Sequence, residues 1–205
     1  MTRLEAIRSI ETGIEIADEK AKEGYRVFTI GEMGISNTTS SACILGAFNH
    51  WNAIEVTGRG TNISDERLRH KIDVVQKAMD VNHPDPNDGL DVLSKVGGFE
   101  YGCMTGVILG AAANHALTII DGFNTTASAF IAKALCPEVV HYLMASHLSL
   151  EQAHKKSLAA LGLTEYIDLD FRLGEAIGAG IQTRMLDYAL SVYRECAAKD
   201  EEVKA

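Results

Sequence analysis

The chain has 205 residues, of which 46% are apolar and 23% charged, and its 19 Lys and Arg against 28 Asp and Glu give a formal net charge of −9 at pH 7. This composition is typical of a folded globular protein and excludes an intrinsically disordered one. The length favours one domain with its own core. The acidic balance argues against a nucleic-acid-binding protein, although it leaves room for a local basic site that binds a phosphorylated small molecule.

Apolar spacing and turn residues predict an alternation of helices and short buried strands. In chain order, the predicted elements are a helix over Thr2–Glu23, a strand over Arg26–Ile30, a helix from Thr38 or Thr39 to about Phe48, a helix from Asp65 to about Val81, helices over Gly89–Val96 and from Gly98 to about Asn114, a strand over Ala116–Ile120, a helix from Thr125 or Thr126, a strand over Val139–Ala145, and helices over Leu150–Leu161 and Glu175–Ala198. The pattern in Tyr166–Arg172 is ambiguous. Short apolar strands separated by helices predict an α/β protein with a parallel sheet.

Four well-separated cysteines without a C-x-x-C pair predict free thiols in a reducing compartment: Cys43, Cys103, Cys136 and Cys196. Met1–Glu23 is charged throughout and does not resemble a signal peptide, so we expect a cytoplasmic protein. The glycosylation sequons at Asn37, Asn62 and Asn124 are therefore interpreted as accidental.

The uncharged run Tyr101–Ile120 has the length of a membrane span. Because it contains three glycines together with Asn114 and His115, its hydrophobicity is modest. We interpret it as a buried helix that continues into a buried strand, and we expect no membrane association.

Three segments are expected beyond the carboxyl ends of the strands, where parallel sheets bind ligands: Gly31–Gly34, Asp121–Thr126 and Ser146–Ser149. A strand, a glycine loop and a helix N-terminus in this order present backbone N–H groups to an anion. A second glycine loop, Thr57–Thr61, precedes Ser64, which is expected to cap the next helix.

Several familiar motifs are incomplete. The string Gly58–Gly60 begins a dinucleotide-binding fingerprint, but Ile63 stands at the third glycine position, and the chain has no Walker P-loop or G-x-S-x-G elbow. His141, His147 and His154 lack the spacing of a zinc signature. They are interpreted as scattered, non-ligating residues on a strand, a loop and a helix, respectively.

Two glycine-containing turns each hold a carboxylate, Glu32 and Glu175. A carboxylate in a tight apolar turn can have a raised pKa and act as a general base, or it can stabilise a helix N-terminus electrostatically. Lys71 lies beside Arg67 on a predicted helix face, and this pattern alone favours a solvated lysine.

Seven strings occur in an order that resembles the nicotinate-nucleotide:dimethylbenzimidazole phosphoribosyltransferases, which act in the assembly of the lower ligand of cobamides. The strings are Gly31–Thr39, Gly58–Thr61 with Lys71, Val96–Glu100, Ile120–Phe123 with Thr125 and Thr126, Ser146 and His147 with Ser149, Leu161–Leu163, and Arg172–Glu175. The matched strings extend over most of the chain.

The resemblance implies transfer of the phosphoribosyl group of nicotinate mononucleotide to dimethylbenzimidazole or a related base, giving α-ribazole phosphate and nicotinate, without a metal or other cofactor. It implies a Rossmann-like parallel sheet flanked by helices. On this reading residues 1–205 form a single domain with an α/β core at about 25–165, and the terminal helices, 1–24 and 175–200, contribute to a smaller helical lobe. The family also forms homodimers.

The resemblance assigns roles residue by residue. Glu175 is the expected general base and Glu32 a second active-site carboxylate, while Lys71 is expected to meet the 5′-phosphate. The expected contacts of the nucleotide and its phosphate are Gly34, Asn37, Thr38, Gly122 and Ser149. Met33 and Leu173 are expected to flank the acceptor base.

The sequence departs from the family pattern at three positions. Ser36 stands where the family usually has glycine, and a positive φ there would strain a serine; otherwise its hydroxyl can add a phosphate contact. Ala176 and Ile177 replace the usual glycine and threonine after the catalytic glutamate, and Ile177 can crowd the site or change which base fits.

Members of the family have a further N-terminal part before the region that matches Met1, and this part supplies residues to the acceptor-base pocket. Three interpretations follow. A separate chain supplies the missing half, which we favour; or this chain acts alone with an altered or open base site; or it binds a nucleotide without turnover.

Overall fold

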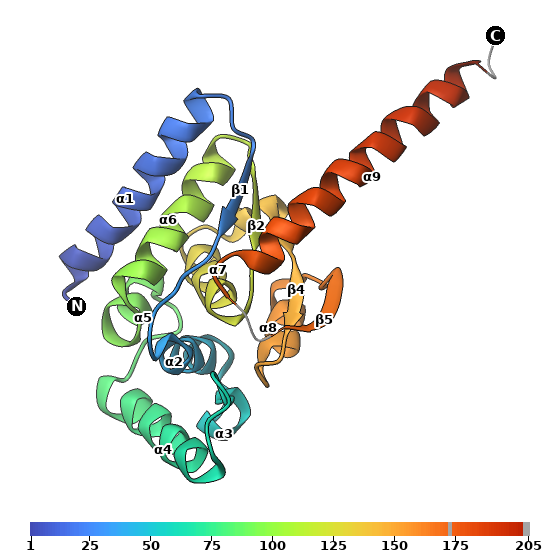
Figure 1. The fold of residues 1–205 in the computed structure, drawn as a ribbon. Helices are drawn as coiled ribbons and strands as arrows, with labels where there is room; N and C mark the ends of the chain where they lie inside the picture. Colours follow the sequence, from blue (N-terminus) through green and yellow to red (C-terminus); the bar gives the residue numbers. More distant parts are fainter. Residues whose placement is uncertain (172–173, 203–205) are drawn as a thin grey trace.

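The computed structural model describes residues 1–171 and 174–202 (Figure 1). Leu173, predicted to flank the acceptor base, lies outside the described residues. The helices are α1 (Arg3–Lys22), α2 (Asn37–Asn49), α3 (Ala53–Val56), α4 (Asp65–Asn82), α5 (Gly89–Val96), α6 (Phe99–Ala113), α7 (Phe123–Leu135), the 3-10 helix η1 (Pro137–Tyr142), α8 (His154–Leu161) and α9 (Ile177–Glu202). The strands are β1 (Val27–Ile30), β2 (Leu117–Ile120), β3 (Leu143–Ala145), β4 (His147–Ser149) and β5 (Ile167–Phe171).

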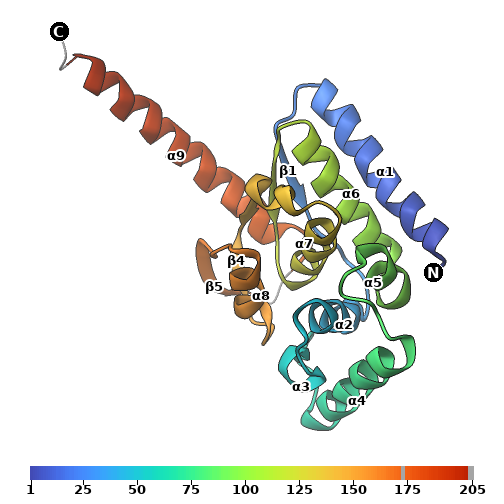
Figure 2. The same cartoon turned by 180° about the vertical axis from the view of Figure 1, so that it is seen from behind.

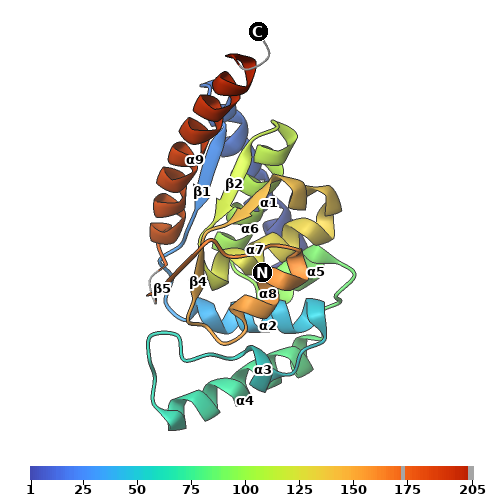
Figure 3. The same ribbon diagram turned by 90° about the vertical axis from the view of Figure 1, so that its right-hand side faces the viewer.

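The strands form two parallel sheets. One has the order β1-β2-β3, with Ile30 opposite Ile120 and Ile120 opposite Ala145, and the other pairs β4 with β5. Helices pack on the three-stranded sheet, with α6 and α7 against β2 and the start of α9 against β1 and β2 (Figure 3). This arrangement confirms the predicted α/β class with parallel strands flanked by helices. Because the strands are parallel, the chain leaves β1, β2 and β3 at the same edge.

Helix α1 lies along α6 (Figures 1 and 2). A Cβ at Gly106 would collide with the carbonyl oxygen of Ile10, and one at Gly13 would collide with that of Cys103, so glycine at both positions allows the two backbones to approach closely. Tyr101–Ile120 is thus a buried helix followed by a buried strand, as predicted. Within the described ranges, no helix combines the length and the apolar character that a membrane crossing requires.

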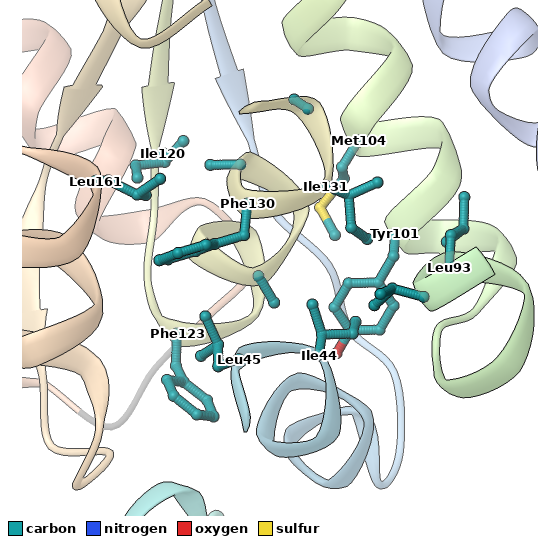
Figure 4. Packing of buried hydrophobic residues seen from close by; sticks show 14 of the residues in the cluster. Ile44, Leu45, Leu93, Tyr101, Met104, Ile120, Phe123, Phe130, Ile131 and Leu161 are labelled. Carbon is teal, nitrogen blue, oxygen red and sulfur yellow. The ribbon is translucent and has the colours of Figure 1, made fainter. Parts of the chain in front are cut away.

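The hydrophobic core lies between α2, α5, α6, α7 and the sheet (Figure 4). Ile44 and Leu45 of α2 point toward Phe130 and Ile131 of α7, and Tyr101 of α6 lies beside them (Figure 4). All five side chains are almost fully buried. This packing holds α2 and α7 against each other.

Several element boundaries differ from the predictions. Helix α2 starts after Ser36 rather than after a threonine cap, α7 starts at Phe123, and α3 was not predicted. Pro137 starts a 3-10 helix where a strand was predicted, since proline fixes φ and suits the first turn of a helix, and the strand shortens to β3.

Helix α8 starts at His154 rather than at Leu150, and the residues before it form β4, which exists because it pairs with the distant β5. The interpretation of two histidines changes accordingly. His141 lies on η1 rather than on a strand, and His147 lies on β4 rather than in a loop.

The two terminal helices leave the sheet in different ways. Helix α1 packs on α6, whereas α9 contacts β1, β2, β4 and β5 near its start and then extends away from the rest of the chain (Figures 1 and 2). Their assignment to one smaller lobe stays a prediction.

Candidate active site

A cavity of about 520 Å³ opens at the edge where the strands of the larger sheet end. Its volume lies in the range of small-molecule sites. The segments that line it are distant in sequence: the loop after β1, the start of α2, the loop before α4, Lys71 of α4, the segment between β2 and the first turn of α7, the end of β4 with the loop after it, and the turn before α9. The cavity collects nine predicted site residues: Glu32, Met33, Gly34, Asn37, Thr38, Lys71, Gly122, Ser149 and Glu175.

The Glu32 carboxylate accepts hydrogen bonds from three N–H donors. The Gly34 amide donates to Oε2 over 2.7 Å, the Asn37 side chain donates to the same oxygen, and the Asn124 side chain donates to Oε1. Glu32 therefore ties the loop after β1 to the starts of α2 and α7.

A series of hydrogen bonds through Ser41 and Tyr101 also holds Asn124 and Asn37. The Ser41 hydroxyl donates to Asn124 Oδ1 over 2.7 Å and lies 2.8 Å from the Tyr101 hydroxyl, which donates to the carbonyl oxygen of Asn37 over 2.7 Å. Burial raises the pKa of Tyr101, so its hydroxyl stays protonated and remains a donor. The side chain of Asn37, predicted to contact the phosphate, is thus already bound to Glu32.

Lys71 projects from α4 toward the start of α2. Its ammonium donates to Thr38 Oγ1 over 2.8 Å and to the carbonyl oxygen of Gly58 over 3.0 Å. Burial lowers its pKa, and the nearby Glu151 carboxylate opposes this shift. An ammonium has three N–H donors, so the two internal acceptors leave one proton for a ligand. Lys71 is therefore a half-buried cation in the cavity wall rather than a solvated surface lysine.

The turn that carries Glu175 is held by a buried carboxylate distant in sequence. Asp121 directly follows β2, and its Oδ1 accepts from the Ala179 amide of α9 over 3.0 Å. The amides of Gly178 and Ala176 also bond to this carboxylate. Burial raises the pKa of Asp121, while these amides and the His147 ring, 3.7 Å away, oppose the shift. Asp121 thus stabilises the N-terminus of α9 and positions the exposed Glu175 at the cavity.

The same turn contacts the loop after β1. A Cβ at Gly31 would collide with the backbone nitrogen of Ala176, so only glycine fits there. Glu175 and Ala176 have φ of 64° and 62°, and Ser36 has φ of 72°. Ser36 and Ala176, which stand at positions where glycine was expected, are therefore both in the left-handed region that strains residues with a Cβ.

Apolar side chains at the cavity are exposed. Met33 is 80% exposed and Ile35 is 96% exposed, and both line the cavity in the loop after β1. Ile63 and Leu150 add further apolar side chains to the cavity wall. This side of the cavity can accept a flat apolar ring.

The sequence analysis placed Asp121 and Asn124 in a segment at the ligand-binding edge of the sheet, Asp121–Thr126, but assigned neither of them a role, and it missed Tyr101. The sequon at Asn124 was interpreted as an accidental glycosylation signal. Tyr101 lies in an apolar run, and nothing local distinguishes it from other core residues.

The chain matches known proteins along almost its whole length. A family model described as "Phosphoribosyltransferase" matches residues 1–203. The nicotinate-nucleotide–dimethylbenzimidazole phosphoribosyltransferases of Syntrophotalea carbinolica and Clostridioides difficile are 49% and 45% identical to it over 201 residues. These residues are 98% of this chain but 57% and 58% of those proteins.

A solved structure is also similar. The crystal structure of CobT from Thermus thermophilus superposes with a TM-score of 0.87 at 37% identity, over 92% of this chain and 56% of that chain. The chain thus spans somewhat more than half the length of the relatives that it matches. The matches confirm the family resemblance of the seven strings, and the chain belongs to this phosphoribosyltransferase family.

Proposed function

We propose that the chain transfers the phosphoribosyl group of nicotinate mononucleotide to dimethylbenzimidazole or a related base, giving α-ribazole phosphate and nicotinate. The observation that carries the proposal is the joint placement of Glu175, Glu32 and Lys71 around one cavity of about 520 Å³. The names of the two bacterial relatives supply the substrates.

The chemistry suits these residue types. The ring of nicotinate mononucleotide is a pyridinium, so it leaves as a neutral heterocycle when the glycosidic C–N bond breaks. One nitrogen of the benzimidazole attacks the anomeric carbon while the other nitrogen carries the proton. A carboxylate that accepts this proton makes the attacking nitrogen more nucleophilic, which contributes typically ~10²–10⁴-fold. Attack opposite the leaving ring converts the β anomer to the α product.

The chain's carboxylates have different surroundings, and we assign them different roles. The Glu32 carboxylate accepts hydrogen bonds from three N–H donors and holds the loops in place. Glu175 is exposed at the cavity on a turn whose backbone Asp121 holds. Glu175 is therefore the proposed general base, and Glu32 positions the loop that faces the base. Lys71 and Thr38 anchor the phosphate, which orients the anomeric carbon for attack.

The test is product formation from nicotinate mononucleotide and dimethylbenzimidazole, followed by chromatography of α-ribazole phosphate. Glu175→Gln is expected to lower kcat by ~10²–10⁴-fold, with little change in the affinity for nicotinate mononucleotide. Glu66→Gln, on the exposed face of α4 outside the cavity, removes the same charge as a control. Unchanged turnover in Glu175→Gln would contradict its role as the base.

We also propose that a further polypeptide covers the base side of the cavity, because Met33 and Ile35 leave large apolar surfaces exposed there. Two occupants fit: a separate chain equivalent to the N-terminal part of a full-length relative, or the second subunit of a homodimer. Light scattering measures the oligomeric state of the chain alone. Turnover is then compared with and without the added N-terminal part of the Syntrophotalea carbinolica enzyme. Full activity of a monomeric chain alone would overturn the covering proposal, and nucleotide binding without turnover under every condition would overturn the enzyme proposal.

A further inference from the structure

His154 connects two loops of the cavity through a fully buried ring. It is the first residue of α8, and it is 1% exposed. Its Nδ1 lies 2.9 Å from the Ser149 amide, which donates to it, and its Nε2 lies 3.1 Å from Thr126 Oγ1. The two partners lie on different segments, since Ser149 ends β4 and Thr126 belongs to the first turn of α7.

The hydrogen bonds fix the tautomer of the ring. Nδ1 accepts from a backbone amide, so it carries no proton, and the neutral ring therefore carries its proton on Nε2. Nε2 then donates to Thr126 Oγ1, and the Thr126 hydroxyl donates in turn to the carbonyl oxygen of Gly122 over 2.8 Å. Each donor in this series of three hydrogen bonds has one acceptor, so the direction of all three bonds is determined.

The surroundings favour the neutral ring. Burial lowers the pKa of His154 to about 3, and the neighbouring His147 ring adds to the shift. The centroid of the His147 ring lies 6.3 Å away, and the Phe123 ring meets His154 edge-on at 6.5 Å. The two groups that hydrogen-bond to the His154 ring, a backbone amide and a hydroxyl, are uncharged, so neither of them stabilises an imidazolium.

The hydrogen bond to His154 limits which groups of Ser149 can bind a ligand. Its amide is bound to His154, so this N–H is not available to a phosphate. Its hydroxyl oxygen accepts from the Glu151 amide at 3.4 Å, which leaves the hydroxyl proton to donate. The Gly122 carbonyl accepts hydrogen bonds from the hydroxyls of both Thr125 and Thr126, so it faces α7 rather than the cavity.

From these contacts we propose that His154 is a positioning residue for nucleotide binding. Acting as a neutral ring protonated on Nε2, it holds Ser149 so that the serine hydroxyl, rather than the amide, donates to an oxygen of the bound mononucleotide. The ligand named here rests on the proposed function, whereas the direction of the hydrogen bonds does not. His154 itself does not touch the substrate.

Nitrogen NMR of the ring tests the hydrogen bonds without any ligand. The His154 signals, assigned by their loss in His154→Asn, are expected to show an unprotonated Nδ1 and a protonated Nε2 from about pH 7 down to about pH 5. Protonation of the ring in this range, or a proton on Nδ1, overturns the proposal. This result stands whether or not the chain binds nicotinate mononucleotide.

Binding variants test the action through Ser149. Calorimetry with nicotinate mononucleotide is expected to show a loss of about tenfold for both variants, because Ser149→Ala removes the hydroxyl that donates to the ligand and His154→Leu removes the acceptor that holds Ser149 in place. If His154 acts through Ser149, the double variant loses no more than either single variant. Additive losses overturn the proposal. His154→Asn, whose Oδ1 can replace Nδ1 as the acceptor, is expected to recover most of the affinity.

Controls separate positioning from folding. His141→Asn, on the exposed η1, is expected to leave binding unchanged. Thr126→Val removes the hydroxyl at nearly constant shape and is expected to weaken binding, while Thr126→Ser retains it and is expected to bind as the parent does. Equal binding by Thr126→Val and the parent, in a protein with an unchanged melting temperature, overturns the part of the proposal that involves Thr126. If His154→Leu does not fold, the His154→Asn and Thr126 variants still decide the outcome.

Discussion

Replacement of Lys71 by methionine is expected to weaken the binding of nicotinate mononucleotide by about 10- to 150-fold. The Lys71 ammonium already donates to Thr38 Oγ1 at 2.8 Å and to the Gly58 carbonyl at 3.0 Å, which directs its remaining proton to the cavity. Two unit charges 4 Å apart attract by roughly 4 kcal/mol at an effective dielectric constant of about 20. The net value of a hydrogen bond to a charged group is about 1.5–3 kcal/mol, because water competes for both partners.

This net energy sets the expected range, since each 1.4 kcal/mol corresponds to about tenfold in affinity. Isothermal titration calorimetry measures the affinity of each variant for nicotinate mononucleotide and for nicotinate riboside, which lacks the phosphate. Lys77→Met, on the same helix but exposed and outside the cavity, is the matched control for the change of charge.

The comparison of the two ligands decides the outcome. If Lys71 binds the phosphate, Lys71→Met lowers the affinity for the mononucleotide and leaves that for the riboside unchanged. Equal losses for both ligands would show that the substitution disturbs the cavity as a whole, and no loss for either would refute the phosphate role. The melting temperature of each variant is recorded alongside, because the substitution also leaves Thr38 and the Gly58 carbonyl without their shared donor.

Three further predictions follow from the site. Burial lowers the pKa of Lys71 below its usual 10.5, so the ammonium loses its proton at a lower pH than a surface lysine would, and the affinity for nicotinate mononucleotide is expected to fall in alkaline solution before the pH reaches 10.5; calorimetry on Lys71→Arg, which keeps its charge, should show no such fall. Ser36→Gly is expected to stabilise the chain by about 1 kcal/mol, because the φ of 72° suits glycine; this raises the melting temperature by about 2–4 °C, and a lower melting temperature would contradict the strain at Ser36. Tyr101→Phe is expected to cost about 1–3 kcal/mol in urea unfolding, because it removes the hydrogen bonds that join the Tyr101 hydroxyl to the Asn37 carbonyl and to Ser41; a change below about 0.5 kcal/mol would show that water replaces the hydroxyl.

Much of the fold could be predicted because the relevant signals are local. Helix α1 begins after Thr2, whose side chain and that of Glu5 form a capping box, and α4 begins after Ser64, whose hydroxyl accepts from the Arg67 amide. Helix α5 has the predicted bounds Gly89–Val96, between an Asp88 cap and two glycines. Caps and apolar spacing act within one or two turns, so a single sequence contains them.

The errors lie where distant segments decide the conformation. Strand β4 exists because it pairs with β5, eighteen or more residues later, and no pattern in three residues reveals such a partner. Ser36 takes a left-handed conformation as the N-cap of α2, although serine disfavours it, because Asn37 and Gly34 bind Glu32 on either side of the turn. Local propensity is a weak term when packing and hydrogen bonds oppose it.

The sequence by itself determined the family, the α/β class and nine of the residues that line the cavity. Seven short strings in order are specific, and the glycine loops that hold Glu32 and Glu175 lie at one edge of the parallel sheet, beside Lys71 on α4. Only the tertiary structure decided which groups each carboxylate contacts. Asp121 accepts from the α9 amide of Ala179, which is 58 positions later in the sequence, and Asn124 donates to Glu32, which is 92 positions earlier. Such bonds depend on which segments fold side by side, and the spacing of residues along the chain does not contain that information.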